Sequence, residues 1–244
     1  MDYKNKTVLI TGASSDIGIS IIEFFVKCQA NVIVTYCKSK DKAMNLVERL
    51  NKDYNVNLEC VYVDLCKENS IDMLYNYVKE KYGKVDILIN NAALSLDNDI
   101  DSKTKKEFMK VLETNVVGTF LMMKYFDKIV DGYIFNMSST DGIDTGNIYS
   151  IDYNASKAAI NSLTKTFSLY SENKIISICP NWVDTNSTKQ MDKNYLENEL
   201  KRIGQDKLIS VDTISKVIDD CIRNNISSGS IIRIEGDDNY GRID

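Results

Sequence analysis

Short runs of β-branched and aliphatic residues alternate with longer segments of helical periodicity, and this alternation limits the possible folds more than any other feature. The apolar runs predict strands at residues 7–11, 31–35, 57–63, 85–90, 133–137, 175–179 and 230–234. Between them, apolar residues recur at the i, i+3, i+4, i+7 spacing of a helix with one buried face, as at Ala43, Leu46 and Leu50. Such alternation builds a parallel sheet between two helical layers. We predict an α/β fold with a seven-stranded, doubly wound parallel sheet and helices on both faces.

The 244-residue chain is expected to form one domain, because no repeat, low-complexity tract or linker interrupts this pattern. Right-handed crossovers place the carboxyl ends of the strands at one edge, and a ligand binds there where the strand order reverses. Residues 181–210 form the least regular stretch and follow a predicted strand. They are a candidate substrate lid over this crevice. The alternative is that this segment has a structural role only.

Composition excludes several classes of partner. The formal net charge is -5 without a basic stretch, so we expect binding to neither nucleic acid nor an anionic membrane surface. No apolar run reaches the roughly 18 residues of a membrane span. The polar start from Met1 to Lys6 does not resemble a signal peptide. We therefore expect a cytoplasmic protein that acts on a small molecule.

The chain has six cysteines without a C-x-x-C pair, and it has no histidine. The cysteines are interpreted as free thiols in a reducing compartment, and no metal site is predicted. The lack of histidine excludes Ser-His-Asp and Cys-His hydrolases. A general acid or base must then be Tyr, Lys, Asp, Glu or Cys.

A strand-to-helix turn spans residues 11–18, with the sequence TGASSDIG, ahead of a helix predicted over residues 19–28. Free N–H groups and the helix dipole at such a turn can hold a pyrophosphate, although simple chain reversal is the alternative. The candidate cofactor-binding residues of this turn are Gly12, Ser14, Ser15, Asp16, Ile17 and Gly18.

Tyr153 and Lys157 lie four residues apart in a helix predicted over residues 149–170, so their side chains share one face. A free tyrosine has a pKa of about 10, and a neighbouring ammonium lowers that pKa by stabilising the phenolate. Tyr153 would then donate a proton to a carbonyl oxygen in reduction and accept one from an alcohol in oxidation. A surface tyrosine and lysine without a catalytic role is the alternative.

Several short motifs occur in a fixed order along the chain. They are T-G-x-x-x-x-x-G, Asp64-Leu65, Asn90-Asn91-Ala92-Ala93, Ser138-Ser139, Tyr153-x-x-x-Lys157 and Pro180-Asn181. Through them, essentially the whole chain resembles the short-chain dehydrogenases/reductases, and within that family the 3-oxoacyl-[acyl-carrier-protein] reductases. The resemblance implies a single NAD(P)-binding Rossmann-fold domain over residues 1–244. It also implies oxidoreductase activity and a homodimer or homotetramer packed through residues 105–127 and 149–170.

The resemblance assigns four catalytic residues. Ser139 would orient and polarise the substrate carbonyl, with turn formation as the alternative use of its hydroxyl. Tyr153 is the acid/base, and Lys157 would also hold the nicotinamide ribose. Asn115 lies in the amphipathic segment 105–127 and would help to hold a water relay to the lysine, with a satisfied core amide as the alternative.

Further cofactor contacts follow from the same resemblance. Asp64 would receive the adenine amine and Leu65 would supply main-chain contacts. Asn91 and Ala92 would flank the ribose. In the segment after Pro180, Val183 and Thr185 would bind the carboxamide.

The end of the second predicted strand favours NADP(H). It reads Thr35-Tyr36-Cys37-Lys38-Ser39 and carries no carboxylate for a ribose 2′-hydroxyl. Cys37, Lys38 and Ser39, together with Ser15, could cradle a 2′-phosphate instead. NAD(H) is the alternative cofactor.

The chain departs from the family pattern at three glycines. Asp16 replaces one of them and is interpreted as a helix N-cap that points away from the pyrophosphate. Ala93 and Asn181 replace two others, where a backbone with positive φ would be strained and cofactor binding weakened.

Three functions remain open. The first is NADPH-dependent reduction of a ketone, with a 3-oxoacyl thioester as one substrate and acyl carrier protein as a partner. The links before Tyr133 and Lys174 are short, however, and the acidic chain shows little sign of a basic patch for an acidic carrier. The second acts on a sterol, a sugar-derived alcohol or a secondary metabolite, and the third is a non-catalytic dinucleotide-binding sensor.

Overall fold

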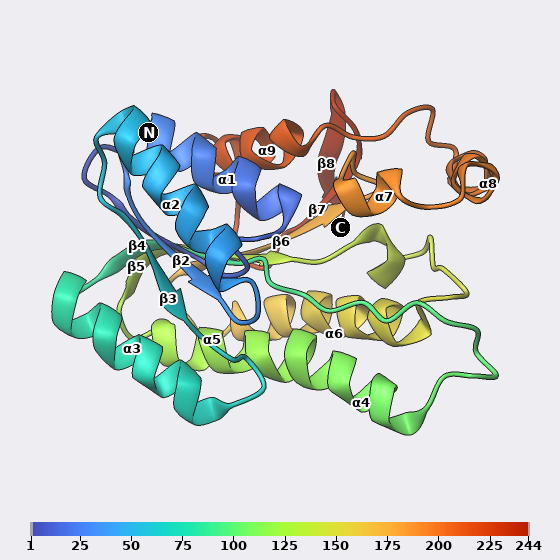
Figure 1. Ribbon diagram of the computed structural model, residues 1–244, viewed down its shortest axis with the longest axis horizontal. Coiled ribbons are helices and arrows are strands. Elements are labelled where there is room, and N and C mark those ends of the chain that lie inside the picture. The colour runs from blue at the N-terminus through green and yellow to red at the C-terminus, as the bar shows by residue number, and fades with distance from the viewer. Residues whose placement is uncertain (1, 244) are drawn as a thin grey trace.

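Eight strands pair in the order β3-β2-β1-β4-β5-β6-β7-β8 in the computed structural model, which describes residues 2–243 (Figure 1). The strands are β1 Thr7–Ile10, β2 Asn31–Tyr36, β3 Leu58–Tyr62, β4 Val85–Asn90, β5 Val130–Met137, β6 Lys174–Pro180, β7 Ile231–Gly236 and β8 Asn239–Ile243. The first seven run parallel, as predicted, and β8 pairs antiparallel with β7. The expected count of seven strands was wrong, because it left out the edge strand β8. The sequence of β8, NYGRI, contains no apolar run that would have predicted a strand.

Helices cover both faces of the sheet. They are α1 Asp16–Lys27, α2 Lys40–Tyr54, α3 Glu68–Tyr82, α4 Lys105–Leu112, α5 Gly118–Phe126, α6 Ile151–Phe167, α7 Asn186–Lys189, α8 Lys193–Ile203 and α9 Val211–Arg223. In Figure 1, α1, α2 and α9 lie on one side of the sheet, and α3, α5 and α6 lie on the other. No helix within residues 2–243 has the length and apolarity needed to cross a bilayer.

Each face of the sheet has its own apolar core. On one face, Phe25 of α1 and Ile218 of α9 pack over side chains such as Val34 of β2. On the other, Leu74 of α3 and Phe126 of α5 pack over the opposite sides of the same strands. The central strands are buried on both faces, which is why they are continuous apolar runs rather than alternating ones.

The strand order reverses between β1 and β4. The chain moves outward from β1 to β3 on one side and then from β4 to β8 on the other. Ile10 of β1 lies beside Ile89 of β4, and the Thr11 N–H donates to the Ile89 carbonyl at 3.0 Å. Both strands end at this point and their loops diverge, which opens a crevice beyond their carboxyl ends.

The helix predicted over residues 105–127 is interrupted. After α4, residues Glu113–Val117 form a π-helical turn before α5 begins. Such a turn inserts one extra residue and is typical of functional regions. The buried Asn115 lies in this turn, where its side chain finds partners outside the helix.

A 3₁₀ turn, η2 (Thr140–Gly142), follows β5 and the two serines and packs directly on α6. A Cβ on Gly142 would lie 2.4 Å from the Lys157 carbonyl carbon and 2.6 Å from the Ala158 nitrogen. Backbone atoms cannot move aside as a flexible side chain can. The absence of a side chain at Gly142 therefore sets the spacing between the serine turn and α6.

The candidate lid is more regular than expected. Residues 181–210 contain α7 and α8, and Val183 forms an isolated parallel bridge with Ile209 that closes the excursion at its base. Val183 and Ile209, near the two ends of this segment, are buried, whereas α8 has no buried residue. In Figure 1, α8 projects from the end of the molecule.

Replacing Gly142 with Ala should destabilise the protein by about 1–3 kcal/mol, the usual cost of overpacking. The expected measurement is the free energy of unfolding from urea titration. Gly241 in β8 is the matched control, because nothing lies within 4 Å of a Cβ built there. Equal stability of the Gly142→Ala and Gly241→Ala variants would contradict the close approach of η2 to α6.

Candidate active site

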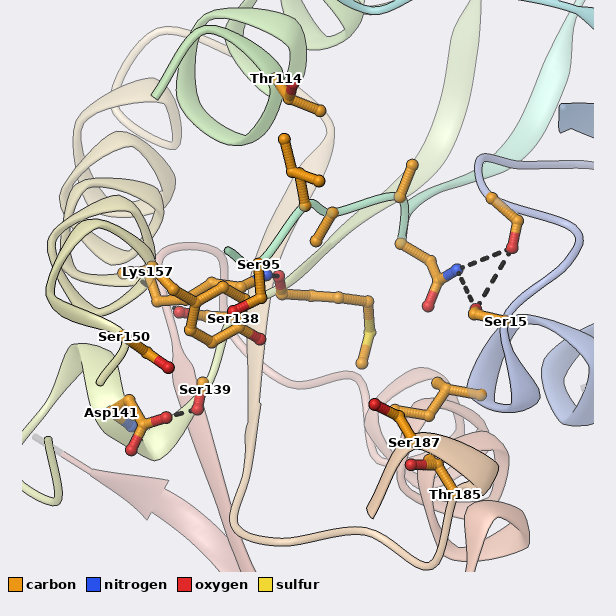
Figure 2. A pocket seen from close by; sticks show the side chains of 18 of the residues that line it. Ser15, Ser95, Thr114, Ser138, Ser139, Asp141, Ser150, Lys157, Thr185 and Ser187 are labelled. Atoms are coloured by element: carbon orange, nitrogen blue, oxygen red, sulfur yellow. Dashed lines mark hydrogen bonds between the residues drawn. The ribbon is translucent and has the colours of Figure 1, made fainter. Parts of the chain in front are cut away.

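A cleft of about 1130 Å³ lies beyond the carboxyl ends of the central strands. It is lined by the predicted residues Gly12, Ser14, Ser15, Ile17, Cys37, Lys38, Ser39, Asp64, Leu65, Asn91, Ala92, Ser139, Tyr153, Lys157, Val183 and Thr185. Asp16, Gly18 and Asn115 are not among the residues that line it. Figure 2 shows Ser139, Asp141, Ser150 and Lys157 toward one end, and Ser15, Thr185 and Ser187 toward the other.

The turn between β1 and α1 is braced by Asn91. Its side-chain amide donates to the carbonyls of Thr11 at 2.9 Å and Gly12 at 3.2 Å, and to the Ser15 hydroxyl at 3.2 Å. Gly12 has a φ of +80°, which a side chain would strain. Gly18 packs behind this turn, against the Gly12 carbonyl. Asn91 thus shapes the turn, a use of its amide that the sequence analysis missed.

Ser15, rather than Asp16, is the N-cap of α1. The Ser15 hydroxyl accepts the Gly18 N–H at 3.0 Å, so the interpretation of Asp16 as the cap was wrong. Asp16 is the first residue of the helix, and its carboxylate accepts the backbone N–H of Asn186 at 2.7 Å and the side-chain amide at 2.8 Å. The carboxylate therefore joins α1 to α7 and does not face the cleft.

The strain expected at Ala93 and Asn181 is absent, because neither residue has a positive φ. The Asn181 N–H pairs with the Ile234 carbonyl at 2.9 Å, as in an ordinary continuation of β6. The prediction failed because these two backbones adopt conformations open to any residue. Asn181 instead adds a side-chain amide to the wall of the cleft.

Lys157 is almost completely buried, with 2% of its surface exposed. Its amine donates to the Met137 carbonyl at 2.6 Å and lies 5.1 Å from the centre of the Tyr153 ring. Burial lowers the pKa of Lys157 to about 8, since a charged amine loses its hydration there. The amine still carries its proton in most molecules at neutral pH.

The pKa of Tyr153 moves in the direction opposite to the expected one. Burial raises the pKa of this phenol above its usual value, and the carboxylates of Asp141 and Asp97 raise it further. The expectation of a lowered pKa was wrong for the protein alone, because burial dominates at this phenol and the Lys157 amine is directed at the Met137 carbonyl. The Tyr153 hydroxyl makes no hydrogen bond to any residue in the described part of the chain, so its proton is available to a ligand.

Ser139 stands beside Asp141 at the same end of the cleft. The Ser139 oxygen accepts the Asp141 N–H at 3.1 Å, which caps η2. Its neighbour Ser138 points elsewhere, because the Ser138 hydroxyl donates to the Lys157 carbonyl at 2.9 Å. Both serines line the cleft, but the Ser138 proton is used to join β5 to α6, whereas Ser139 acts as an acceptor at the start of η2.

Asn115 has a fully satisfied side chain. Its oxygen accepts the Leu94 N–H at 2.8 Å, and its amide donates to the Leu94 carbonyl at 2.9 Å and to Ser156 at 3.0 Å. Ser156 in turn donates to the Tyr153 carbonyl at 2.7 Å. The side chain behaves as a core amide that joins the π-helical turn to the first turn of α6.

The opposite end of the cleft carries basic and hydroxyl groups. Lys38 and Ser39 are exposed at the rim, and Ser39 caps α2 without a side-chain hydrogen bond. The Lys42 amine donates to the Ser14 carbonyl, which joins α2 to the first turn. Asp64 pairs with Lys67 at 3.3 Å, and its other oxygen accepts the Cys66 N–H at 3.1 Å.

Val183 and Thr185 form the start of the 181–210 segment. The Thr185 hydroxyl caps α7 by accepting the Thr188 N–H at 3.2 Å. The Val183 carbonyl accepts the Thr185 N–H at 2.9 Å in the turn that leads to α7. Both residues line the cleft.

A buried ion pair beneath Tyr153 escaped the sequence analysis. Lys103 and Asp152 lie 2.9 Å apart, with 4% and 0% of their side chains exposed. The other Asp152 oxygen accepts the Tyr153 N–H at 2.9 Å, and the Lys103 amine also donates to the Leu96 carbonyl. No local pattern connects positions so far apart in the chain. This pair fixes the start of α6 and with it the position of Tyr153.

Comparison with known families matches residues 6–196 to the family model described as short chain dehydrogenase. The chain is 30% identical over 244 residues to a 3-oxoacyl-[acyl-carrier-protein] reductase of Staphylococcus epidermidis, covering 95% of this chain and 98% of the relative. It is also 30% identical over 173 residues to 3beta-hydroxysteroid dehydrogenase 1 of Eggerthella lenta, covering 69% of this chain and 66% of that protein.

A solved structure has the same fold. A short chain dehydrogenase from Burkholderia cenocepacia, in complex with NADP, has a TM-score of 0.88 with this chain at 20% identity. The superposition covers 98% of this chain and 100% of that one. The resemblance inferred from the sequence motifs is confirmed by these matches.

Replacing Lys103 with Met should cost about 3–5 kcal/mol of stability, because it leaves the Asp152 carboxylate buried without its partner. Thermal and urea unfolding measure this loss. Lys124→Met is the control, since Lys124 and Glu68 form a pair at 3.3 Å with 51% and 53% of their side chains exposed. Water and salt screen such a pair, and no measurable change is expected. Similar losses in both variants would refute a special role for the buried pair.

Proposed function

Because this chain belongs to the short chain dehydrogenase family, we propose that it reduces a ketone to a secondary alcohol with NADPH, and that Tyr153 supplies the proton. The NAD(P)-dependent oxidoreductase class comes with the family. One observation carries the finer proposal: Ser139, Tyr153 and Lys157 line the same cleft as the turn at the start of α1. A proton donor and a phosphate-binding helix N-terminus thus share one cavity.

The residues present fit a dinucleotide. The volume of about 1130 Å³ extends from Lys38 past the turn at Gly12 to Lys157. The N–H groups of Asp16 and Ile17 at the start of α1 make no hydrogen bond within residues 2–243 and can bind phosphate oxygens there, and the Asp16 carboxylate is turned away toward Asn186. Bound NADPH would supply the hydride. Asp64 and Leu65, Asn91 and Ala92, and Val183 and Thr185 are the residues proposed to hold its adenine, ribose and carboxamide.

The proton chemistry follows from the environment of Tyr153. Since burial and nearby carboxylates raise its pKa, the phenol is protonated at neutral pH and acts as an acid. As the ketone oxygen gains negative charge, Tyr153 donates its proton to that oxygen and Ser139 donates a hydrogen bond. The Lys157 ammonium stabilises the phenolate left behind. Asn115 acts as a positioning residue, through Ser156 and the Tyr153 carbonyl.

The proposed preference for NADP(H) over NAD(H) is supported by the groups after β2. Lys38 and Ser39 line the cleft together with Cys37 and Ser15, and no carboxylate lies within residues 35–39. The Ser39 hydroxyl is not used to cap α2 and can donate to a phosphate. A 2′-phosphate also gains from the N-terminal end of the α2 dipole.

The relatives suggest two substrate classes, through names that refer to 3-oxoacyl-[acyl-carrier-protein] and to a 3beta-hydroxysteroid. A carrier protein is acidic and favours a basic surface. In this chain, the segments that lead into β5 and β6 line a second pocket of about 640 Å³. Its walls include the acidic residues Asp127, Asp131 and Glu172. This charge disfavours carrier docking at that place. A non-catalytic sensor is disfavoured by the proton donor and amine kept in the cleft.

We also propose a homodimer or homotetramer formed through residues 105–127 and 149–170. These segments expose large apolar side chains, whose contact with water is unfavourable. Such exposed apolar patches are typical of subunit interfaces. They include Met109, Val117, Phe120, Ile151, Leu169 and Tyr170.

Replacing Tyr153 with Phe should lower kcat by roughly a hundredfold to ten-thousandfold, because it removes only the acidic proton. NADPH affinity, measured by fluorescence titration, should stay near the wild-type value. Tyr149→Phe is the control, since Tyr149 lies one turn earlier and does not line the cleft. Wild-type turnover by the Tyr153→Phe variant would refute the acid role.

Replacing Lys38 with Ala should raise KM for NADPH by roughly tenfold and leave KM for NADH nearly unchanged, because a charge-assisted hydrogen bond to the 2′-phosphate is lost. Initial rates with each cofactor measure the two constants. Lys52→Ala removes a cation from the last turn of α2, the helix that follows Lys38, and should affect neither constant. An equal rise for both cofactors would mean that Lys38 does not recognise the 2′-phosphate.

A further inference from the structure

We infer that the ketone reduced here carries a hydroxyl group next to its carbonyl, and that Asp141 is the residue that selects for this hydroxyl. This inference rests on the proposed reductase function and names its substrate class. The relatives' names point to acyl and steroid substrates, whose atoms beside the carbonyl offer no hydrogen-bond donor. The groups at the reacting end of this cleft instead require one.

Asp141 stands next to the reacting atoms. It lines the cleft two residues after Ser139, and its charge acts on the Tyr153 phenol (Figure 2). Thr145 donates to one carboxylate oxygen at 2.9 Å, and Ser139 is the other side chain hydrogen-bonded to this group when its hydroxyl is not donating to a ketone oxygen. A carboxylate has about four acceptor positions, so about two remain for a ligand.

A second carboxylate lines the same region. Asp97 accepts hydrogen bonds from the hydroxyls of Ser95 and Ser150, both at 2.6 Å, through one of its two oxygens. All three residues line the cleft. The other Asp97 oxygen accepts no hydrogen bond within residues 2–243. Acceptor capacity therefore remains on both carboxylates at this end.

Asn181 is an independent sign of an incomplete polar site. Only 9% of its surface is exposed, it lines the cleft, and its side-chain oxygen is buried without a partner in the described part of the chain. Buried amides in folded proteins nearly always have a partner. The family pattern has glycine here, so this chain has added a polar side chain to a wall that functions without one.

These groups discriminate between ligands through the cost of desolvation. An alkyl chain beside the carbonyl would displace water from Asp141 without replacing its hydrogen bonds, which is unfavourable. A hydroxyl would donate to the carboxylate and could also accept from the side-chain nitrogen of Asn181, which lines the cleft and makes no hydrogen bond within residues 2–243. An ammonium could only donate, so a site that offers both carboxylate acceptors and an amide donor fits an alcohol better. An anionic substrate would be repelled.

The test compares hydroxyacetone with butanone, which has a methyl group in place of the hydroxyl. NADPH oxidation should give a kcat/KM for hydroxyacetone roughly tenfold to a hundredfold higher, the usual range for one hydrogen bond to a charged group. Asp141→Asn keeps an acceptor for Thr145 and removes the charge, and should reduce this ratio to within about twofold. The readout is the ratio of the two kcat/KM values, because a general loss of folding or of cofactor binding lowers both values equally and leaves their ratio unchanged.

Asp144→Asn is the matched control. Asp144 lies in the same loop but does not line the cleft, and it pairs with Arg233 at 2.6 Å. Arg233 keeps a second partner in Glu235 at 2.8 Å, so the loop should stay in place. This variant should keep the wild-type preference for hydroxyacetone.

Two further substrates separate the outcomes. If acetoacetyl-coenzyme A or butanone is reduced as well as hydroxyacetone, or if Asp141→Asn keeps the preference, the inference fails while the reductase proposal stands. If aminoacetone is preferred over hydroxyacetone, Asp141 selects a cation and the hydroxyl assignment is wrong. If none of the four is reduced with either cofactor, the reductase proposal fails and this inference fails with it.

Discussion

The parallel pairing of β1 with β4 is the contact on which the cleft depends. Because Ile10 and Ile89 lie side by side at the point where strand order reverses, the loops after these strands must part. One loop leads to the N-terminus of α1 and the other to the backbone at Asn91, which supports the first turn. Strands β5 and β6 then add the serine turn and the 181–210 segment to the same edge. This arrangement of strand ends places the first turn, the serine turn and the 181–210 segment, whereas Tyr153 and Lys157 come from α6.

Burial acts on the two central ionisable groups in the same sense. It raises the pKa of Tyr153 and lowers that of Lys157, so both groups are biased toward their neutral forms. A site prepared in this way holds a proton on its phenol and a weakly held proton on its amine.

The sequence predicted what local pattern can encode. Buried parallel strands are continuous apolar runs, so all seven parallel strands were found, and most of the site residues predicted from the ordered motifs line the cleft. Long-range pairings could not be found this way. The ion pair of Lys103 with Asp152 joins residues 49 apart, and β8 is held by its neighbour rather than by its own propensity. The π-helical turn at Asn115 likewise depends on Leu94, a partner outside the helix.

The hydrogen bonds between Asp16 and Asn186 have an evolutionary consequence. The two residues are 170 positions apart, yet each provides the hydrogen-bond partner of the other. Asp16 is a charged residue at a position where the family has glycine, and Asn186 presents a free amide at the first turn of α7. A mutation of one alone would leave its counterpart with water as its only partner, because these hydrogen bonds are exposed. Among descendants of this gene, substitutions at the two positions should therefore be inherited in matched combinations, as compensatory changes, even where neighbouring positions drift independently.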